Sequence, residues 1–223
     1  MQDAIARCAE DVSRIVDQLL DALLPSEGTF ALLMELVEER IGAALVARET
    51  EPPACGPGCA ACCTVNVGTL AVEGAAIAAF LRARLGPEDA SGKARALLDF
   101  HERVRWLDDG ERIRERLACP FLDSARACAI HPVRPLACRS VSSLDPAECR
   151  RAIEERSGED PGLVRMDLVQ HAIYDASIER LAAAVAGRGL DGRLRDVTGM
   201  AGAFLADPGL ARSFGEGARV PLD

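Results

Sequence analysis

The cysteines are the feature that most constrains this chain. Of nine in all, only Cys8 stands apart; the others fall within 55–63 and within 119–149, two stretches rich in proline and glycine. The clustered set is Cys55, Cys59, Cys62, Cys63, Cys119, Cys128, Cys138 and Cys149. Irregular segments have little hydrophobic core of their own, so thiols gathered there are better explained as ligands than as buried small side chains. The sequence predicts metal or cluster binding.

The spacing within the first segment suits coordination. Gly56, Pro57 and Gly58 favour a tight turn that could bring two thiolates to one ion. If the adjacent pair Cys62-Cys63 is extended, its side chains point to opposite sides, and one ion is not expected to take both. Two four-thiolate sites, or one cluster plus accessory thiols, therefore both stay open.

Disulfides explain these cysteines less well. The first residues are polar and acidic, unlike a signal peptide, and no run of about 18 apolar residues could span a membrane. We therefore expect a cytoplasmic protein, in which thiols stay reduced. A redox pair at Cys59 and Cys62 has C-x-x-C spacing but lacks the strand–helix context of a thioredoxin-like site.

Apolar residues elsewhere recur at helical spacing, which predicts a mainly α fold: a helical bundle with an irregular, cysteine-rich metal-binding lobe. An N-terminal helical hairpin is expected over 1–50. A cysteine-cluster domain follows over 51–155, and a second helical hairpin inserted at about 70–118 should bring its two cysteine segments together. Helices in 156–223 should pack on the same body.

Several local signals place helix ends. We expect Thr69 to cap one helix and Gly86-Pro87 to end it. Asp145 should cap another, with Glu148 as the reciprocal carboxylate of a capping box. Asp160-Pro161 should start a long helix that reaches about Ala186, and the last helix should cover roughly 192–206.

Other candidate sites have ordinary explanations. Cys8 lies on the apolar face of the first helix and is expected in the core. His101 and His171 are expected to be surface or satisfied core groups, and His131 a loop residue rather than a ligand. Gly187–Gly192 matches G-x-G-x-x-G, but an alanine-rich helix precedes it, so a helix end and a turn are expected there.

The net charge limits the classes of binding partner that can be expected. A net charge of −9 argues against nucleic acid and against an anionic membrane surface, which both need a basic face. A protein partner or substrate remains open. No strand–helix glycine motif for S-adenosylmethionine is present, which counts against a self-contained methylase.

Four motifs, in order, resemble the YkgJ-type cysteine-cluster family, also called the CxxCxxCC zinc- or iron-chelating domain. They are Cys55-Gly-Pro-Gly-Cys59-Ala-Ala-Cys62-Cys63, Cys119-Pro-Phe-Leu122, Cys128-Ala-Ile-His-Pro-Val-Arg134-Pro135-Leu-Ala-Cys138-Arg139 and Glu148-Cys149-Arg-Arg. The resemblance covers about 51–155. The chain departs from the family pattern in its first gap, which has three residues rather than two, and at His131, where an aromatic residue is common.

The resemblance implies a metal or iron–sulfur protein with these eight cysteines as ligands. The cofactor would be an iron–sulfur cluster, with [4Fe–4S] as one form, or zinc. Arg134 and Arg139 would lie beside the ligands and offset the charge of the thiolates. Some relatives are labelled iron–sulfur oxidoreductases and others are lysine methylases acting on flagellin. A redox or accessory protein of a modifying enzyme, and a structural module stapled by zinc, are therefore the alternatives.

Vicinal cysteines are less usual in simple zinc ribbons, and Cys119-Pro120 resembles the end of a ferredoxin motif. Both observations favour iron–sulfur slightly.

Overall fold

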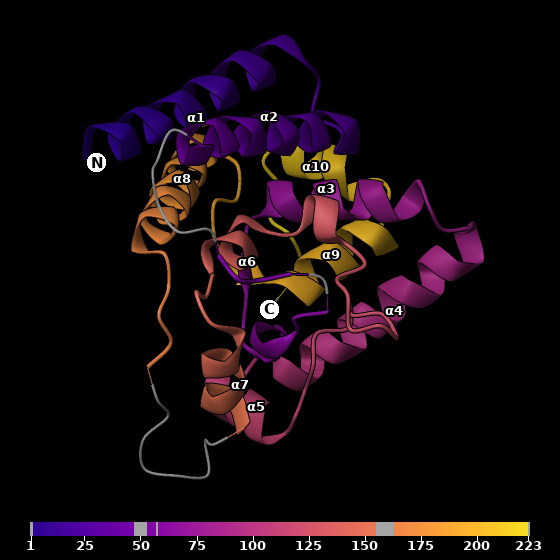
Figure 1. The fold of residues 1–223 in the computed structure, drawn as a ribbon. Coiled ribbons are helices and arrows are strands. Elements are labelled where there is room, and N and C mark those ends of the chain that lie inside the picture. The colour runs from indigo at the N-terminus through magenta and orange to yellow at the C-terminus, as the bar shows by residue number, and fades with distance from the viewer. Residues whose placement is uncertain (1, 47–52, 57, 155–162, 223) are drawn as a thin grey trace.

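The computed structural model describes residues 2–46, 53–56, 58–154 and 163–222, and it confirms the predicted mainly helical class (Figure 1). The helices in these ranges are α1 (Gln2–Ala22), α2 (Glu27–Val46), α3 (Ala71–Arg82), α4 (Pro87–Val104), α5 (Asp109–Arg114), α6 (Leu136–Ser140), α7 (Pro146–Glu154), α8 (Leu168–Gly187), α9 (Val197–Ala206) and α10 (Leu210–Gly215). Two 3₁₀ turns, η1 (Ala61–Thr64) and η2 (His131–Val133), and two short strands complete the fold.

The two N-terminal helices form the expected hairpin and lie across one end of the molecule (Figure 1). Helix α1 turns Cys8, Val12 and Val16 inward, all fully buried, and packs on α8 as well as on α2. The Cys8 thiol lies 3.9 Å from the hydroxyl of Ser177 on α8. Cys8 is thus a core residue, as predicted.

Helix α9 is the centre of the core. All its residues from Val197 to Leu205 are buried, and it packs against both α3 and α4. The approach to α3 is close, because a methyl group at Gly74 would meet the Cβ atom of Met200 at 2.9 Å. The chain turns between α3 and α4 at Gly86, with Pro87 as the first residue of α4, where a fixed φ is tolerated.

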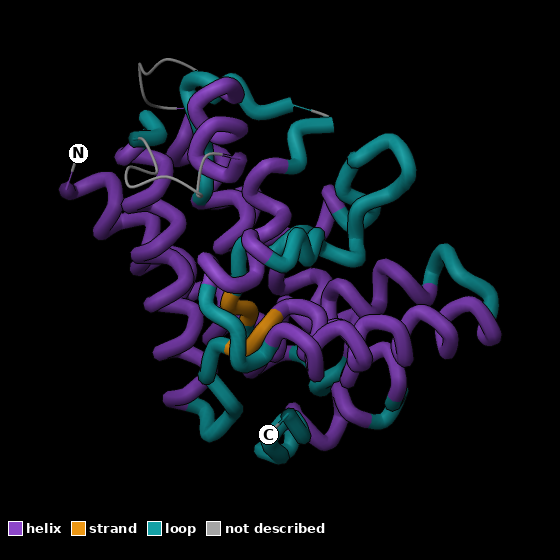
Figure 2. Tube along the Cα trace, turned by 90° about the horizontal axis from the view of Figure 1, so that it is seen from below, coloured by secondary structure: helices purple, strands orange, loops and turns teal. Residues whose placement is uncertain are grey.

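Two strands of two residues each were not expected. They are β1 (Gly68–Thr69) and β2 (Arg195–Asp196), which pair antiparallel and lie in the middle of the helices (Figure 2). Thr69 is therefore a buried strand residue and not a helix cap, and that prediction was wrong. The first turn of α3 is completed by Glu73, whose carboxylate accepts the Leu70 N–H at 2.8 Å.

The C-terminal helix boundaries also differ from the predictions. Asp160 and Pro161 lie outside the described residues, but 163–167 is not helical, and α8 begins at Leu168 after the N-cap Asp167. The residues expected to begin the last helix instead form a loop and β2, so α9 begins only at Val197. Helix α10 was missed.

The division into domains at residues 50 and 155 stays a prediction.

None of the helices in the described part of the chain combines the length and the apolar character needed to cross a bilayer.

Candidate metal centre

The fold brings the two cysteine segments into direct contact. The N–H of Cys119 donates to the carbonyl of Cys63 at 2.7 Å, across 56 positions of sequence. A second link joins Ala54 to Ser143, again between backbone groups, at 2.8 Å. Helix α7 packs against η1, which places Cys149 at the same end of the molecule. The two cysteine segments therefore meet, as expected, although the helices between them, α3 and α4, each pack on α9 more than on each other.

The first segment is a turn followed by a 3₁₀ helix. Gly58 adopts a positive φ of 82°, and the N–H of Cys59 donates to the carbonyl of Gly56 at 3.0 Å, which closes the predicted turn. Pro57, part of that prediction, lies outside the described residues. Cys62 and Cys63 lie in η1 and not in an extended strand, and their thiols interact. The argument that they point apart therefore does not apply.

The second segment is shaped by local polar contacts. Asp123 accepts the N–H groups of Ala125 and Ala127, both at 2.9 Å, and so folds the loop that leads to Cys128. Leu122 and Cys128 then form an isolated antiparallel bridge. Cys138 lies in the short helix α6, and Cys149 in α7.

Helix α7 begins as predicted, with one difference. Asp145 caps it by accepting the Ala147 N–H at 2.8 Å. Glu148 does not complete a capping box: its carboxylate instead accepts from the backbone and the guanidinium of Arg165, at 2.9 and 2.7 Å. The expected partner, the N–H of Asp145, donates to Ser143. Because Ser143 already accepts the Asp145 N–H, the Glu148 carboxylate pairs with Arg165 instead.

The thiols influence one another electrostatically in two overlapping groups. Cys55 is affected by Cys59, Cys62 and Cys149, whereas Cys138 is affected by Cys119, Cys62 and Cys128. Cys62 belongs to both groups. Burial raises the pKa of Cys138, and its neighbouring thiols raise it further.

The pKa of Cys62 is raised first by its hydrogen bond with Cys63 and then by burial. Without a cation, therefore, the Cys62 thiol is held in the neutral form.

No three cysteine, histidine or carboxylate side chains in the described ranges converge closely enough to hold one metal ion in this arrangement. Which cysteines coordinate therefore stays a prediction. The chemistry of the donor set nevertheless suits a soft metal, because the clustered ligands are all sulfur and both zinc and iron–sulfur centres accept thiolates. His131 is exposed and contributes only backbone contacts to this loop.

The charges of both arginines predicted to lie beside the ligands lower the pKa of Cys128. The charge of Arg134 lowers the pKa of Cys62, Cys128 and Cys138 against the stronger effect of burial. Arg139 donates to the carbonyls of the loop before it and pairs with Glu38 at 2.8 Å. Both groups could offset thiolate charge, although their role toward a cofactor stays a prediction.

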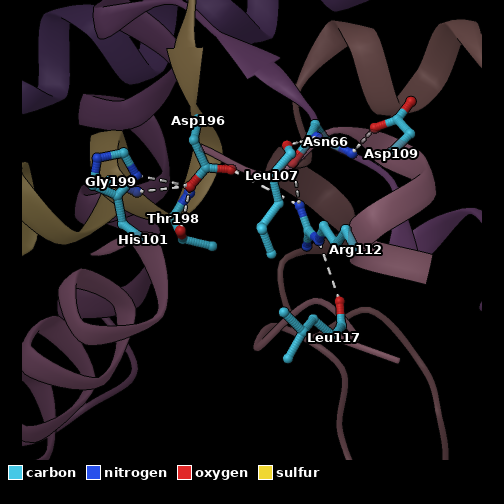
Figure 3. Close-up of polar contacts among 9 residues, drawn as sticks. All are labelled: Asn66, His101, Leu107, Asp109, Arg112, Leu117, Asp196, Thr198 and Gly199. Atoms are coloured by element: carbon cyan, nitrogen blue, oxygen red, sulfur yellow. Dashed lines mark hydrogen bonds and ion pairs between the residues drawn. The ribbon is translucent and has the colours of Figure 1, made fainter. Parts of the chain in front are cut away.

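Sequence reasoning missed a buried arginine that connects both cysteine segments (Figure 3). Arg112 is 1% exposed. Its guanidinium donates to the Leu117 carbonyl at 3.2 Å, two residues before Cys119, and to the Asn66 side chain at 3.3 Å, three residues after Cys63. An arginine in a short helix gives no sequence signal for such a role.

The anchor of this arginine is Asp196, at the start of α9. Asp196 lies between His101 and Arg112 in Figure 3, with its oxygens 3.3 Å from the His101 ring and 4.0 Å from the guanidinium. Its Oδ1 also accepts from Thr198 and from the Gly199 N–H. His101 is therefore a satisfied core group, as expected, and the cluster ties the cysteine segments to the central helix.

A lysine supplies a further anchor that was not predicted. The Lys93 ammonium donates to the Pro120 carbonyl at 2.7 Å and lies over the Phe121 ring. It fixes the residues directly after Cys119 to α4.

The remaining candidates have the structural roles expected of them. Helix α8 ends at Gly187, and Gly189 has a φ of +75°, so the G-x-G-x-x-G match is a helix end and a turn. His171 lies on the surface of α8 and contacts Asp175 at 3.1 Å.

Comparison with known proteins agrees with the cysteine pattern. Residues 54–157 match the family model CxxCxxCC, whose description is "Putative zinc- or iron-chelating domain". No curated protein and no solved structure gives a significant match to the chain.

Proposed function

Given that residues 54–157 belong to the CxxCxxCC family, we propose that this protein binds zinc or an iron–sulfur cluster through cysteine thiolates. The observation that carries the proposal is the 2.7 Å hydrogen bond from Cys119 to Cys63, because it joins the two cysteine segments directly. A chain that only buried its thiols as small hydrophobes would have no need to gather them in irregular loops.

The two thiol groups suggest how ligands would be divided. By these electrostatic influences, Cys62, Cys119, Cys128 and Cys138 form one group, here called the enclosed group, and Cys55, Cys59 and Cys149 form the other, here called the outer group. Cys63, hydrogen-bonded to Cys62, is assigned to neither. The enclosed group would hold the principal metal, and the outer group a second ion or the accessory thiols. We favour an iron–sulfur cluster because vicinal cysteines are unusual in simple zinc sites.

The cofactor would supply electron transfer if it is iron–sulfur, or rigidity and Lewis acidity if it is zinc. The chain's own residues would position the sulfurs and balance their charge. Arg134 faces the enclosed group, and Arg112 and Lys93 hold the backbone on either side of Cys119. A redox or accessory role for a modifying enzyme is compatible with this arrangement.

The test is anaerobic purification followed by analysis of zinc, iron and acid-labile sulfide. Iron and sulfide together with broad visible absorbance would indicate a cluster, and stoichiometric zinc in a colourless protein would indicate a zinc site. Cys138→Ser should lower the metal content, whereas Cys8→Ser, a matched change in the core, should not. A protein that contains neither metal and whose eight clustered thiols all react freely would refute the proposal.

A further inference from the structure

Lys93 on α4 reaches the residues that directly follow Cys119. Its ammonium donates to the Pro120 carbonyl at 2.7 Å and lies 5.4 Å from the centre of the Phe121 ring. The side chain is half-buried. Because both contacts are with the two residues after Cys119, they hold the positive charge of the ammonium near that thiol.

This charge has no acid to balance it. Within the described part of the chain, Lys93 has no carboxylate partner. Burial lowers the pKa of Lys93, and the Cys119 thiol is the group whose charge opposes that effect. A cation that is partly removed from water is stabilised by a counter-charge beside it. The Cys119 sulfur is placed to provide that counter-charge once it is a thiolate.

Arg112 also lies near Cys119, but its charge is already paired. The guanidinium lies 4.0 Å from Asp196. At Cys119 the two charges act in opposite directions, because Arg112 lowers the pKa of the thiol and Asp196 raises it. Lys93 therefore brings to Cys119 a positive charge that no paired acid cancels.

The backbone around Cys119 also favours a charged sulfur. The N–H of Phe121 donates to the Cys119 sulfur, and a hydrogen bond of this kind stabilises a thiolate. In the metal-free protein burial outweighs these effects and raises the pKa of Cys119. A metal ion binds the thiolate form, so coordination would supply the negative charge that Lys93 lacks.

We propose that Lys93 is a positioning residue of the metal centre, and that its ammonium is the counter-charge of the Cys119 thiolate when a metal is bound. The inference rests on the proposed function, because the thiolate forms on coordination. It adds that the charge of Lys93, and not only its hydrogen bond to Pro120, contributes to metal affinity.

The test is a titration of the reduced, metal-free protein with Zn²⁺ in competition with a chromogenic chelator. Lys93→Gln keeps an N–H donor for the Pro120 carbonyl but removes the charge, and it should weaken zinc binding about tenfold. Lys93→Arg keeps the charge and should bind zinc within about threefold of the unchanged protein. Arg95→Gln is the matched control, because it removes one charge from an exposed position on the same helix and should leave the affinity unchanged.

The outcomes separate the two claims. If the unchanged protein takes up no zinc, this inference falls together with thiolate coordination. If it binds zinc and Lys93→Gln binds zinc equally well, only the role of the charge is refuted. Lys93→Arg as weak as Lys93→Gln would also overturn it, as would weak binding in Lys93→Met alone, which would assign the effect to the lost hydrogen bond.

Discussion

The buried contacts of Arg112 lead to a sharp prediction about stability. Arg112→Met keeps an unbranched apolar stem but removes the guanidinium. The change removes the hydrogen-bond donor to the Leu117 carbonyl and to the Asn66 side-chain oxygen, and it leaves Asp196 buried without its cation. Removing one partner of a buried ion pair costs about 3–5 kcal/mol.

The structure places the expected cost at the lower end of that range. The guanidinium lies 4.0 Å from Asp196, and that carboxylate keeps its contacts with His101 and Thr198. We therefore expect the free energy of unfolding to fall by about 3 kcal/mol. For a chain of this size, that corresponds to a decrease in Tm of roughly 6–12 °C.

Urea denaturation followed by circular dichroism measures the change. Arg114→Met is the matched control, because Arg114 is an exposed arginine in the same helix and should change stability by less than about 0.5 kcal/mol. A loss below about 1 kcal/mol in Arg112→Met would refute the reasoning. A double-mutant cycle with Asp196→Asn should show a coupling energy of at least about 0.5 kcal/mol, and additive effects would count against the pair.

Three further predictions concern packing, titration and the metal. Gly199→Ala should lower the free energy of unfolding by about 1–3 kcal/mol, because the new methyl would lie 2.8–2.9 Å from three ring atoms of His101. Gly42→Ala is the control: it lies in open space on α2 and should be neutral or stabilising. Equal effects of the two changes in urea denaturation would contradict this prediction. Burial raises the pKa of Glu38 from 4.5 to about 7, against the charges of Arg139 and Arg134. The stabilising effect of its protonated form is therefore complete below pH 4.5 and is lost as the pH rises through 7. Glu38→Gln should flatten the decline in stability over that interval. If the pH profile of the variant runs parallel to that of the unchanged protein, the Glu38 carboxyl is unperturbed. If the protein binds a metal as proposed, removing that metal with a chelator should leave the helical circular dichroism signal largely intact, because contacts of Cys119, Arg112 and Lys93 already fix the cysteine segments. Collapse of the signal would instead favour zinc as the element that holds the fold together.

Helical periodicity predicted the parts of the fold that depend on local pattern. The hairpin of α1 and α2, the core position of Cys8 and the turn at Pro87 all follow from residues near one another in sequence. The strands could not be predicted, because two residues are too few to show alternation. Their pairing of Gly68 with Asp196 depends on contacts between distant segments.

The candidate metal centre likewise has features that the sequence predicts and features that it does not. Clustered cysteines are visible in the sequence because their spacing is unusual, and the return of the two segments could be reasoned from the helices between them. The contacts that fix them are not visible, because Arg112, Lys93 and Asp196 come from three elements and carry no motif. Similarly, Glu148 was assigned to a local cap, but a residue 17 positions away is its partner.

The residues that match the family model are fewer than the residues needed to fold, because α9, at the centre of the core, lies outside the match. The family match ends at residue 157, yet β1 pairs with a strand at 195–196, and the helix after it fills the space against α3 and α4. A fragment cut to the matched residues would leave the buried faces of α3 and α4 open to water and Arg112 without its acid. For expression or for transfer into another protein, this cysteine domain has to be taken with the residues through the end of α10.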